Sequence, residues 1–314
     1  MLVAMVCCLF QQREVLWEAK ASVRALAVSE SESEVAVGTR ELHLIERKSL
    51  RHRVVEESSN APIWSIASAG PKTWLTGDAK GMVRLVRDGR TAARLENRLS
   101  GWVRSIVVSG DSGSGGDTAY AVGCNTISQL KVPSLEVIKV LDAGRTSDSE
   151  EPWRRHDILC IDEEDGHLVA GLNDGSLRYF KSSVMSDEIR GPRVIGAFFA
   201  SSGGLITADR LGTVRRYDDK KKAETRSVSL LNNNGDDRLT CSCVFRGLVV
   251  LGTTEGIIVL DDLSLDLRWR GSLCSDEIGR KISALAVLNR GNRLLDLVVA
   301  DGHGQVSHVQ LTLT

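Results

Sequence analysis

Aromatic residues, proline and an excess of either charge are all scarce in this 314-residue chain. Phe, Trp and Tyr make up 4% of the residues, and there are 5 prolines. The 40 Lys and Arg residues are matched by 41 Asp and Glu, which gives a formal net charge of -1. This balance argues against a protein that binds nucleic acid or a membrane surface through its overall charge, although a local basic face is compatible with it. Val, Leu, Ala and Gly fill the apolar positions, which favours tightly packed sheets over a large aromatic ligand pocket.

The chain also lacks a recognisable disulfide or metal-binding pattern. Its 7 cysteines are odd in number and include no C-x-x-C pair, and its 6 histidines are scattered. Most of the cysteines lie in apolar, strand-like runs, which favours buried thiols in a reducing compartment over disulfides or a zinc site. The cysteines are Cys7, Cys8, Cys124, Cys160, Cys241, Cys243 and Cys274. We therefore predict no metal and no cofactor.

No hydrophobic run is long enough to cross a bilayer. The best candidate, Met1–Phe10, lacks a positively charged start and a small-residue cleavage site. It continues into Glu14–Ala19, which has the pattern of a strand, so we expect a structural use rather than a signal peptide. The sequence thus predicts a soluble protein with no membrane span, located in the cytoplasm or, alternatively, in the nucleus.

One pattern recurs along the whole chain: an apolar run, a small residue, a short polar turn and an alternating run. WLTGDAKGMVRLV from Trp74 and LVAGLNDGSLRYF from Leu168 are two copies. The small residues that mark the copies are Gly38, Gly77, Gly123, Gly171, Ala208, Gly252 and Ala300. They lie roughly 37 to 48 residues apart, and one β-propeller blade takes ~40–45 residues. Seven copies predict an all-β, seven-bladed propeller that forms one domain over residues 1–314.

Each copy predicts one blade of four antiparallel strands. The repeat itself has the pattern of two strands joined by a tight turn, such as Asn173–Gly175. A run that is apolar on both faces precedes each pair, as expected of an innermost strand packed between neighbouring blades. These runs begin at Val23, Ile63, Val103, Ile158, Val194, Leu239 and Ile282. More polar runs (RHRVVEE, TAARLE, LEVIKVL, ETRSVS and LDLRWRG) predict outer fourth strands in five of the copies.

The two ends of the chain are expected to complete one blade together. The last copy has three evident strands before Thr314, and the run Val15–Ala19 precedes the first inner strand without a blade of its own. Pairing this run with the last copy would remove an exposed sheet edge and close the ring. Met1–Phe10 is then surplus, and an extra strand, part of an eighth blade or a tail are alternatives for it.

The unit, an inner strand followed by a run of the form LxxGxxDGxhRhh, resembles the WD repeat, and this resemblance covers nearly the whole chain. It implies a propeller that acts as a scaffold. The copies are degenerate: Val86-Arg87 or Phe180-Lys181 stands where WD repeats end in Trp-Asp, and the initial Gly-His is missing. Two stretches, EVLWEAKA from Glu14 and GIIVLDDLSLDLRWRG from Gly256, are similar instead to quinoprotein-type repeats, but they bring no identifiable quinone- or metal-binding residues.

The same resemblance implies a buried hydrogen-bond network in the repeat turns. In WD repeats the turn Asp and the opening His belong to this network. Asp78, Asp174 and Asp301 stand at matching turn positions without the His, so the network is expected to be incomplete.

Catalytic signatures are absent from the sequence. There is no G-x-S-x-G, H-E-x-x-H or phosphate-binding G-x-x-x-x-G-K-[ST] motif. The acidic run Asp162–Asp165 could hold a cation or a general acid, but it is more typical of a hairpin turn. His303, between two glycines, is likewise more typical of an exposed turn residue than of a ligand or proton carrier. We predict that the protein is not an enzyme, and a channel-mouth active site assembled from several blades stays open as an alternative.

Residues that flank the starts of the inner strands are expected to ring one mouth of the propeller. Arg and Trp recur there, and both types are over-represented in binding hot spots. The predicted binding residues are Arg24, Trp64, Trp102, Arg104, Arg193, Arg238 and Lys281. They favour a rim that binds an acidic or phosphorylated segment of another protein. In the alternative, the Trp rings pack between blades and the Arg side chains are only solvated.

The sequence therefore predicts a non-catalytic scaffold or adaptor that mediates protein–protein interactions within a larger complex. The second hypothesis is a propeller that contacts RNA or a ribonucleoprotein through the same rim. The two differ in salt dependence, because counterion release makes nucleic-acid binding fall steeply with salt.

Overall fold

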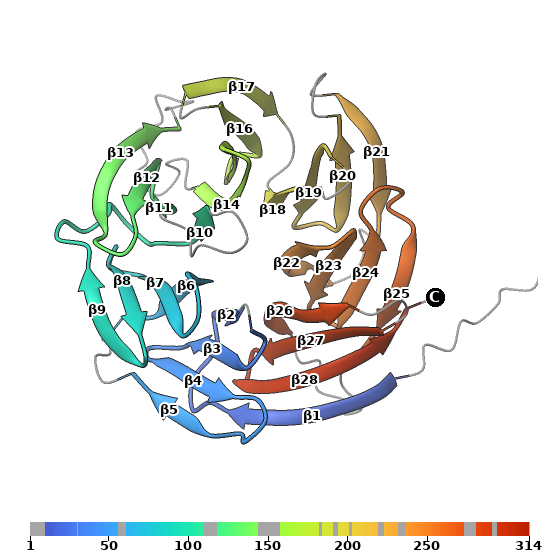
Figure 1. The fold of residues 1–314 in the computed structure, drawn as a ribbon. Coiled ribbons are helices and arrows are strands. Elements are labelled where there is room, and N and C mark those ends of the chain that lie inside the picture. The colour runs from blue at the N-terminus through green and yellow to red at the C-terminus, as the bar shows by residue number, and fades with distance from the viewer. Residues whose placement is uncertain are drawn as a thin grey trace, which may run out of the picture.

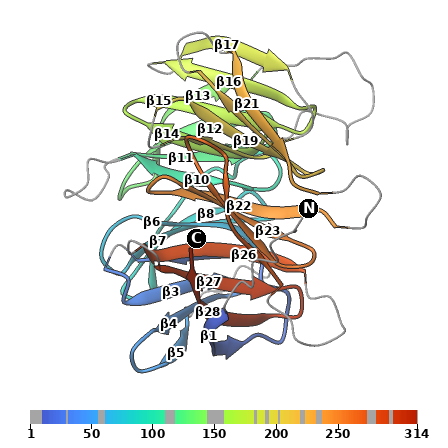
Figure 2. The same ribbon diagram turned by 90° about the vertical axis from the view of Figure 1, so that its right-hand side faces the viewer.

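The computed structural model describes residues 10–29, 31–55, 61–109, 118–143, 158–181, 184–190, 194–200, 203–218, 223–231, 237–272, 281–290 and 294–313. These residues form seven four-stranded antiparallel sheets around a common centre, a seven-bladed β-propeller (Figure 1). Turned by 90°, the ring is seen from its edge (Figure 2). Within the described ranges, no helix is long and apolar enough to cross a membrane.

The first four blades run in chain order from the centre outward. Blade 1 consists of β2 (Ala25–Val28), β3 (Glu34–Gly38), β4 (Leu42–Glu46) and β5 (His52–Val54). Blade 2 consists of β6 (Ile63–Ser68), β7 (Thr73–Asp78), β8 (Val83–Arg87) and β9 (Arg90–Arg94). Blade 3 consists of β10 (Ile106–Ser109), β11 (Thr118–Gly123), β12 (Thr126–Lys131) and β13 (Glu136–Asp142). Blade 4 consists of β14 (Ile158–Glu164), β15 (His167–Leu172), β16 (Ser176–Lys181) and β17 (Val184–Arg190).

The remaining blades follow the same plan, except that the seventh takes a strand from the N-terminal region. Blade 5 consists of β18 (Val194–Phe199), β19 (Leu205–Asp209), β20 (Thr213–Tyr217) and β21 (Glu224–Ser229). Blade 6 consists of β22 (Leu239–Phe245), β23 (Leu248–Thr253), β24 (Ile257–Asp261) and β25 (Leu267–Gly271). Blade 7 consists of β26 (Ile282–Arg290), β27 (Leu294–Asp301), β28 (Gln305–Thr312) and β1 (Phe10–Glu18).

The recurring small residue allows each blade to pack closely on the next one. Gly77 lies in the second strand of blade 2, and a Cβ atom added there would come within 2.3 Å of Val103 Cγ1 at the start of the next inner strand. A Cβ added at Gly171 of blade 4 would come within 2.7 Å of Val194 Cγ2 of blade 5. Real Cβ atoms do not approach other atoms this closely, so the repeat requires glycine at these contacts.

The ring closes as the sequence predicts. β1 is the outermost strand of blade 7, and it pairs with β28 in antiparallel register from Phe10↔Leu311 to Glu18↔Gln305 (Figure 1). Trp17 of β1 also contacts two histidines of blade 1: its ring is tilted against that of His43, with centroids 4.4 Å apart, and stacked on that of His52, with centroids 4.8 Å apart. The N-terminal strand therefore joins the last blade by hydrogen bonds and the first blade by ring contacts. Of the surplus segment Met1–Phe10, only Phe10 lies within the described residues.

Buried aspartates do stabilise the repeat turns, but their partner is an arginine and not a histidine. Asp78 is 1% exposed, and its Oδ1 accepts hydrogen bonds from the backbone N–H groups of Lys80 and Met82. Its Oδ2 accepts one from Arg84 Nη1 at 3.2 Å. Asp209 repeats this arrangement with Arg215 Nη1 at 2.8 Å. In blades 2 and 5, the arginine six residues after the aspartate therefore provides the hydrogen bond that was expected to be missing without the histidine.

One of the three aspartates assigned to this turn position was assigned wrongly. Asp78 and Asp301 pair with the first residue of their inner strands, Ile63 and Ile282. In blade 4 the residue in this register is Leu172, whereas Asp174 is exposed in the turn and bonds with Ser176. Gly171 pairs with Leu177 as Gly77 pairs with Val83, so the two turns have the same length and Asp174 corresponds to Lys80 of blade 2.

The outer strands predicted from sequence are all present, as β5, β9, β13, β21 and β25. The sequence did not identify β17, the outer strand of blade 4. The polar loop Gly144–His156 lies outside the described residues.

Candidate binding site at the channel mouth

One side chain from each blade lines a cavity at the centre of the ring. The first residue of each inner-strand run, Val103 for example, is buried between blades, and the next residue faces the cavity because side chains alternate along a strand. The seven lining residues at this position of the repeat, in blade order, are Arg24, Trp64, Arg104, Leu159, Ile195, Thr240 and Ser283. The cavity has a volume of about 420 Å³, which lies within the range of ~300–1,000 Å³ typical of ligand pockets.

Four of the predicted binding residues form one stack at the edge of this cavity. The rings of Trp64 and Trp102, from blades 2 and 3, lie with centroids 5.0 Å apart and planes 15° from parallel. The Arg24 guanidinium lies 4.5 Å from the centroid of Trp64 on one side. The Arg104 guanidinium lies 4.9 Å from Trp102 and 5.7 Å from Trp64. Such cation–π contacts are each worth ~0.5–2 kcal/mol, so the two guanidinium groups are oriented before any ligand binds.

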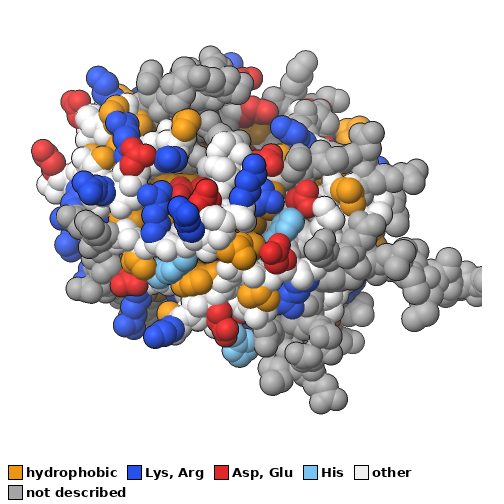
Figure 3. All heavy atoms as spheres, turned by 60° about the horizontal axis from the view of Figure 1, so that its bottom comes forward, with side chains coloured by type: hydrophobic (Ala, Val, Ile, Leu, Met, Phe, Trp, Pro, Cys, Tyr) orange, Lys and Arg blue, Asp and Glu red, His pale blue; other side chains and the backbone are white. Residues whose placement is uncertain are grey.

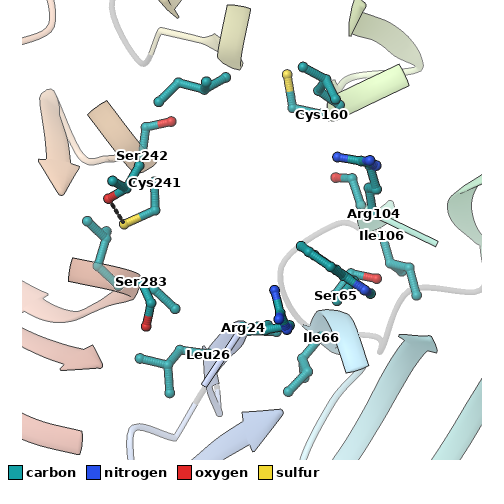
Figure 4. A pocket seen from close by; sticks show the side chains of 18 of the residues that line it. Arg24, Leu26, Ser65, Ile66, Arg104, Ile106, Cys160, Cys241, Ser242 and Ser283 are labelled. Carbon is teal, nitrogen blue, oxygen red and sulfur yellow. Dashed lines mark hydrogen bonds between the residues drawn. The ribbon is translucent and has the colours of Figure 1, made fainter. Parts of the chain in front are cut away.

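The cavity is locally cationic in a protein of balanced charge. Two arginines line it, and the described residues contribute no acidic side chain to its lining. Arg24 is exposed, and its guanidinium forms no ion pair or hydrogen bond with the described residues; it lies over the Trp64 ring instead. Figure 4 shows Arg24 and Arg104 reaching toward the centre of the ring, with Ser242 and Ser283 on the other side. On the face of the molecule shown in Figure 3, basic and acidic side chains are interspersed.

The structure separates the remaining predicted rim residues from this stack. Arg238 and Lys281 are exposed, and neither lines the cavity. Their backbones are fixed to the neighbouring turns: Arg238 N–H donates to Thr254 Oγ1, and the Lys281 carbonyl accepts from Gly302 N–H. Arg193 lies outside the described residues.

Trp102 is partly exposed, and its ring contacts the neighbouring blade. The residue is 45% exposed, and it lies just ahead of β10 against Trp64 of blade 2. Trp64 itself is half-buried, and its Nε1 is a buried donor with no hydrogen-bond partner among the described residues. The two rings thus make a contact between blades, as in the alternative prediction, and Trp102 also offers exposed surface.

Sequence inspection missed the apolar and hydroxyl-bearing part of the cavity wall. Leu159, Ile195, Thr240 and Ser283 occupy the same position in their blades as Arg24 and Trp64, one residue after the buried start of the run. Their equivalent position in the repeat could therefore have identified these four residues as cavity residues from the sequence. It was overlooked because only Arg and Trp were sought there.

Two cysteines, Cys160 and Cys241, also line the cavity, and burial determines their chemistry. Burial raises the pKa of the Cys160 thiol to about 12 and that of Cys241 to about 12. Both thiols are consequently protonated at neutral pH. A nucleophilic cysteine needs the thiolate, so these residues are suited to packing and not to covalent chemistry.

His303 lies in a turn, as the sequence predicts, whereas Asp162, Glu163 and Glu164 form the end of β14 and only Asp165 of the acidic run lies in the turn that follows. Asp165 and Gly166 form the β14–β15 turn, both with positive φ, and Glu163 accepts a hydrogen bond from Gly166 N–H. His303 is exposed in the β27–β28 turn, where its N–H donates to Asp301. Among the described residues, no three His, Cys, Asp or Glu side chains are placed to hold a metal ion together.

Comparison with protein-family models finds none that matches this chain. Comparison with the sequences of curated proteins finds no significant match either.

Proposed function

We propose that this protein is a WD-repeat-like, non-catalytic scaffold that binds other proteins through its channel mouth. The observation that supports this function is the stack Arg24–Trp64–Trp102–Arg104 beside a cavity to which the described residues contribute no acidic side chain. Trp64 lies in β6, and the other three residues lie directly ahead of β2 and β10; the ring and cation–π contacts orient the side chains, which therefore lose little entropy on binding. Trp102 offers exposed apolar area, and the arginines offer forked donors for a carboxylate or phosphate.

The ligand that fits this site is an acidic or phosphorylated segment of a partner protein. An anion is attracted to the two guanidinium groups, and the described residues that line the cavity include no carboxylate. RNA is the second hypothesis, because exposed Trp and Arg side chains also stack on bases. The two Trp rings stack on each other, however, so only the outer face of Trp102 is available to a base without rearrangement.

The test is the binding of fluorescein-labelled acidic and phosphoserine peptides and of a single-stranded RNA, followed by anisotropy. The double variant Trp102→Ala/Arg104→Ala is expected to lose peptide binding with little change in melting temperature, because Trp102 is exposed. The control variant Arg238→Ala/Lys281→Ala removes two exposed charges outside the cavity and is expected to bind with nearly unchanged affinity.

Three results would contradict the proposal. Unimpaired binding by the double variant at normal stability would move the site elsewhere, and the loop Gly144–His156 would be the next candidate. A steep log-linear loss of RNA binding with salt, without peptide binding, would favour the nucleic-acid hypothesis. A large fall in the melting temperature of the double variant would assign the stack a structural role.

A further inference from the structure

The lining residues that follow the buried starts of the inner-strand runs give the cavity wall three chemically different parts. Blades 1 to 3 contribute the cationic and aromatic side chains Arg24, Trp64 and Arg104. Blades 4 and 5 contribute the apolar side chains Leu159 and Ile195, with Phe198 beside them. Blades 6 and 7 contribute the hydroxyl groups of Thr240, Ser242 and Ser283. A ligand at this mouth therefore meets positive charge on one side and apolar surface on another.

The hydroxyl part is mostly committed to the fold. Thr240 Oγ1 donates to backbone carbonyls of Gly252 and Ile282, the second of which belongs to the next blade. Ser283 Oγ donates to the carbonyls of Ala300 and Asp301. Their protons are therefore not available to a ligand. Ser242 Oγ has no hydrogen-bond partner among the described residues, but it is buried. The arginine side of the cavity is therefore the main site for an anion.

Further apolar side chains extend the hydrophobic part of the cavity around the ring. Leu26, Ile66, Ile106, Ile161 and Leu285 line the cavity together with Phe198. An apolar side chain that entered the channel would replace water against this lining. Burial of a Leu-sized side chain is favourable, and an anion alone would leave the apolar lining hydrated.

From this division we infer that the partner segment carries an acidic side chain beside an aliphatic one. The acidic group is held by Arg24 and Arg104, and the aliphatic side chain enters the channel against Leu159, Ile195 and Phe198. This inference rests on the proposed function and names the chemistry that the site selects. A segment with only acidic residues leaves the apolar wall unused. A segment with only apolar residues desolvates the arginines without a counter-charge, which costs free energy.

The experiment is a selection of phage-displayed random dodecapeptides on the intact protein, followed by affinity measurement with synthetic peptides. We expect the enriched sequences to share an Asp or Glu next to Leu, Ile, Val or Met. Replacing the aliphatic residue of the best peptide by Ala is expected to weaken binding by about tenfold or more, the loss that follows from exposing a side chain of this size. Replacing its acidic residue by Asn or Gln should weaken binding comparably.

A double-mutant cycle links the peptide to the channel wall. The variant Ile195→Ala should bind the parent peptide more weakly but should bind the Ala-substituted peptide about as well as the unmodified protein does. The control is Leu211→Ala, which truncates a residue that is 64% exposed in a turn of the same blade, outside the cavity. It should leave both affinities unchanged. Melting temperatures of both variants verify that the ring is intact.

The outcomes separate the inference from the proposed function. If acidic peptides are enriched without an aliphatic neighbour and Ile195→Ala binds them normally, the proposed function stands and this inference fails. If no peptide is enriched, or if the enriched peptides bind the Trp102→Ala/Arg104→Ala variant equally well, the proposed function fails as well.

Discussion

His43 Nδ1 and His52 Nε2 lie 3.0 Å apart, a distance at which the two facing nitrogens share one proton and cannot both carry one. The other nitrogen of His43 lies 3.1 Å from Thr39 Oγ1. The ring of Trp17 in β1 contacts the imidazole rings of both His43 and His52. His43 is 6% exposed. Burial first, and the charge of His52 second, lower the pKa of His43 to about 4. The contact between the N-terminal strand and blade 1 thus depends on a neutral histidine.

We predict that acid weakens the folded protein through His43. The unfolded chain binds a proton on this histidine near pH 6.5, and the folded protein does so only near pH 4, so the free energy of unfolding falls as the pH is lowered between these values. The contribution is roughly 3 kcal/mol. Urea unfolding at several pH values measures it, and His43→Gln should flatten the dependence. His303→Gln, in an exposed turn, is the control; an equal flattening there would contradict the assignment.

Asp162 is predicted to act with the opposite sign. Burial, reinforced by the charges of Glu164 and Glu163, raises its pKa to about 6. The folded protein therefore holds a proton that the unfolded chain has released, and the charge of Asp162 destabilises the fold above about pH 6. Asp162→Asn keeps an oxygen that can accept the hydrogen bond from Phe199 N–H and should stabilise the protein at neutral pH by roughly 2 kcal/mol. The gain should disappear near pH 4.

Chemical denaturation of Asp162→Asn at neutral and acidic pH tests this expectation. Asp165→Asn, in the exposed turn of the same hairpin, should change stability by less than about 0.5 kcal/mol at either pH. A loss of stability for Asp162→Asn at neutral pH would show that the carboxylate is needed in its charged form.

The buried ion pair Asp78–Arg84 is predicted to be essential to blade 2. Arg84→Met leaves the Asp78 carboxylate buried with only the two turn N–H groups as partners, so we expect a loss of about 3 kcal/mol. Arg87→Met, at the exposed end of the same strand, is the matched control and should cost less than about 0.5 kcal/mol. Thermal unfolding compares the two, and similar losses would contradict a special role for the pair.

Deletion of residues 1–21 is predicted to destabilise the whole ring. It removes β1, exposes the edge of β28 and removes the Trp17 contacts with blade 1. We expect a lower melting temperature and a tendency to aggregate, because an unpaired strand edge recruits other chains. Deletion of residues 1–9 keeps every β1–β28 pair and serves as the control. A soluble, monomeric and equally heat-resistant 1–21 deletion would show that closure by β1 is dispensable.

The repeat pattern alone determined the number of blades, the strand order and the closure by the N-terminal strand. It could do so because these features depend on local alternation and on a small residue at a fixed place in each copy. Gly77 is informative without a structure, since any larger residue there would collide with the next blade. β17 gave no comparable signal: it is an outer strand with a weak apolar pattern, and its pairing with β16 decides its place.

The candidate site was only half visible in the sequence. Arg24, Trp64 and Arg104 occupy equivalent positions, so the alternation of the inner strands places them at one mouth. Only the tertiary structure decided that Trp102 stacks on Trp64 and that Arg238 and Lys281 stay outside the cavity. The same holds for the arginines that neutralise the buried turn aspartates Asp78 and Asp209. The partner of each of these residues depends on how the strands and blades pack against one another. Ring stacking and ion pairing also produce no periodic pattern in the sequence.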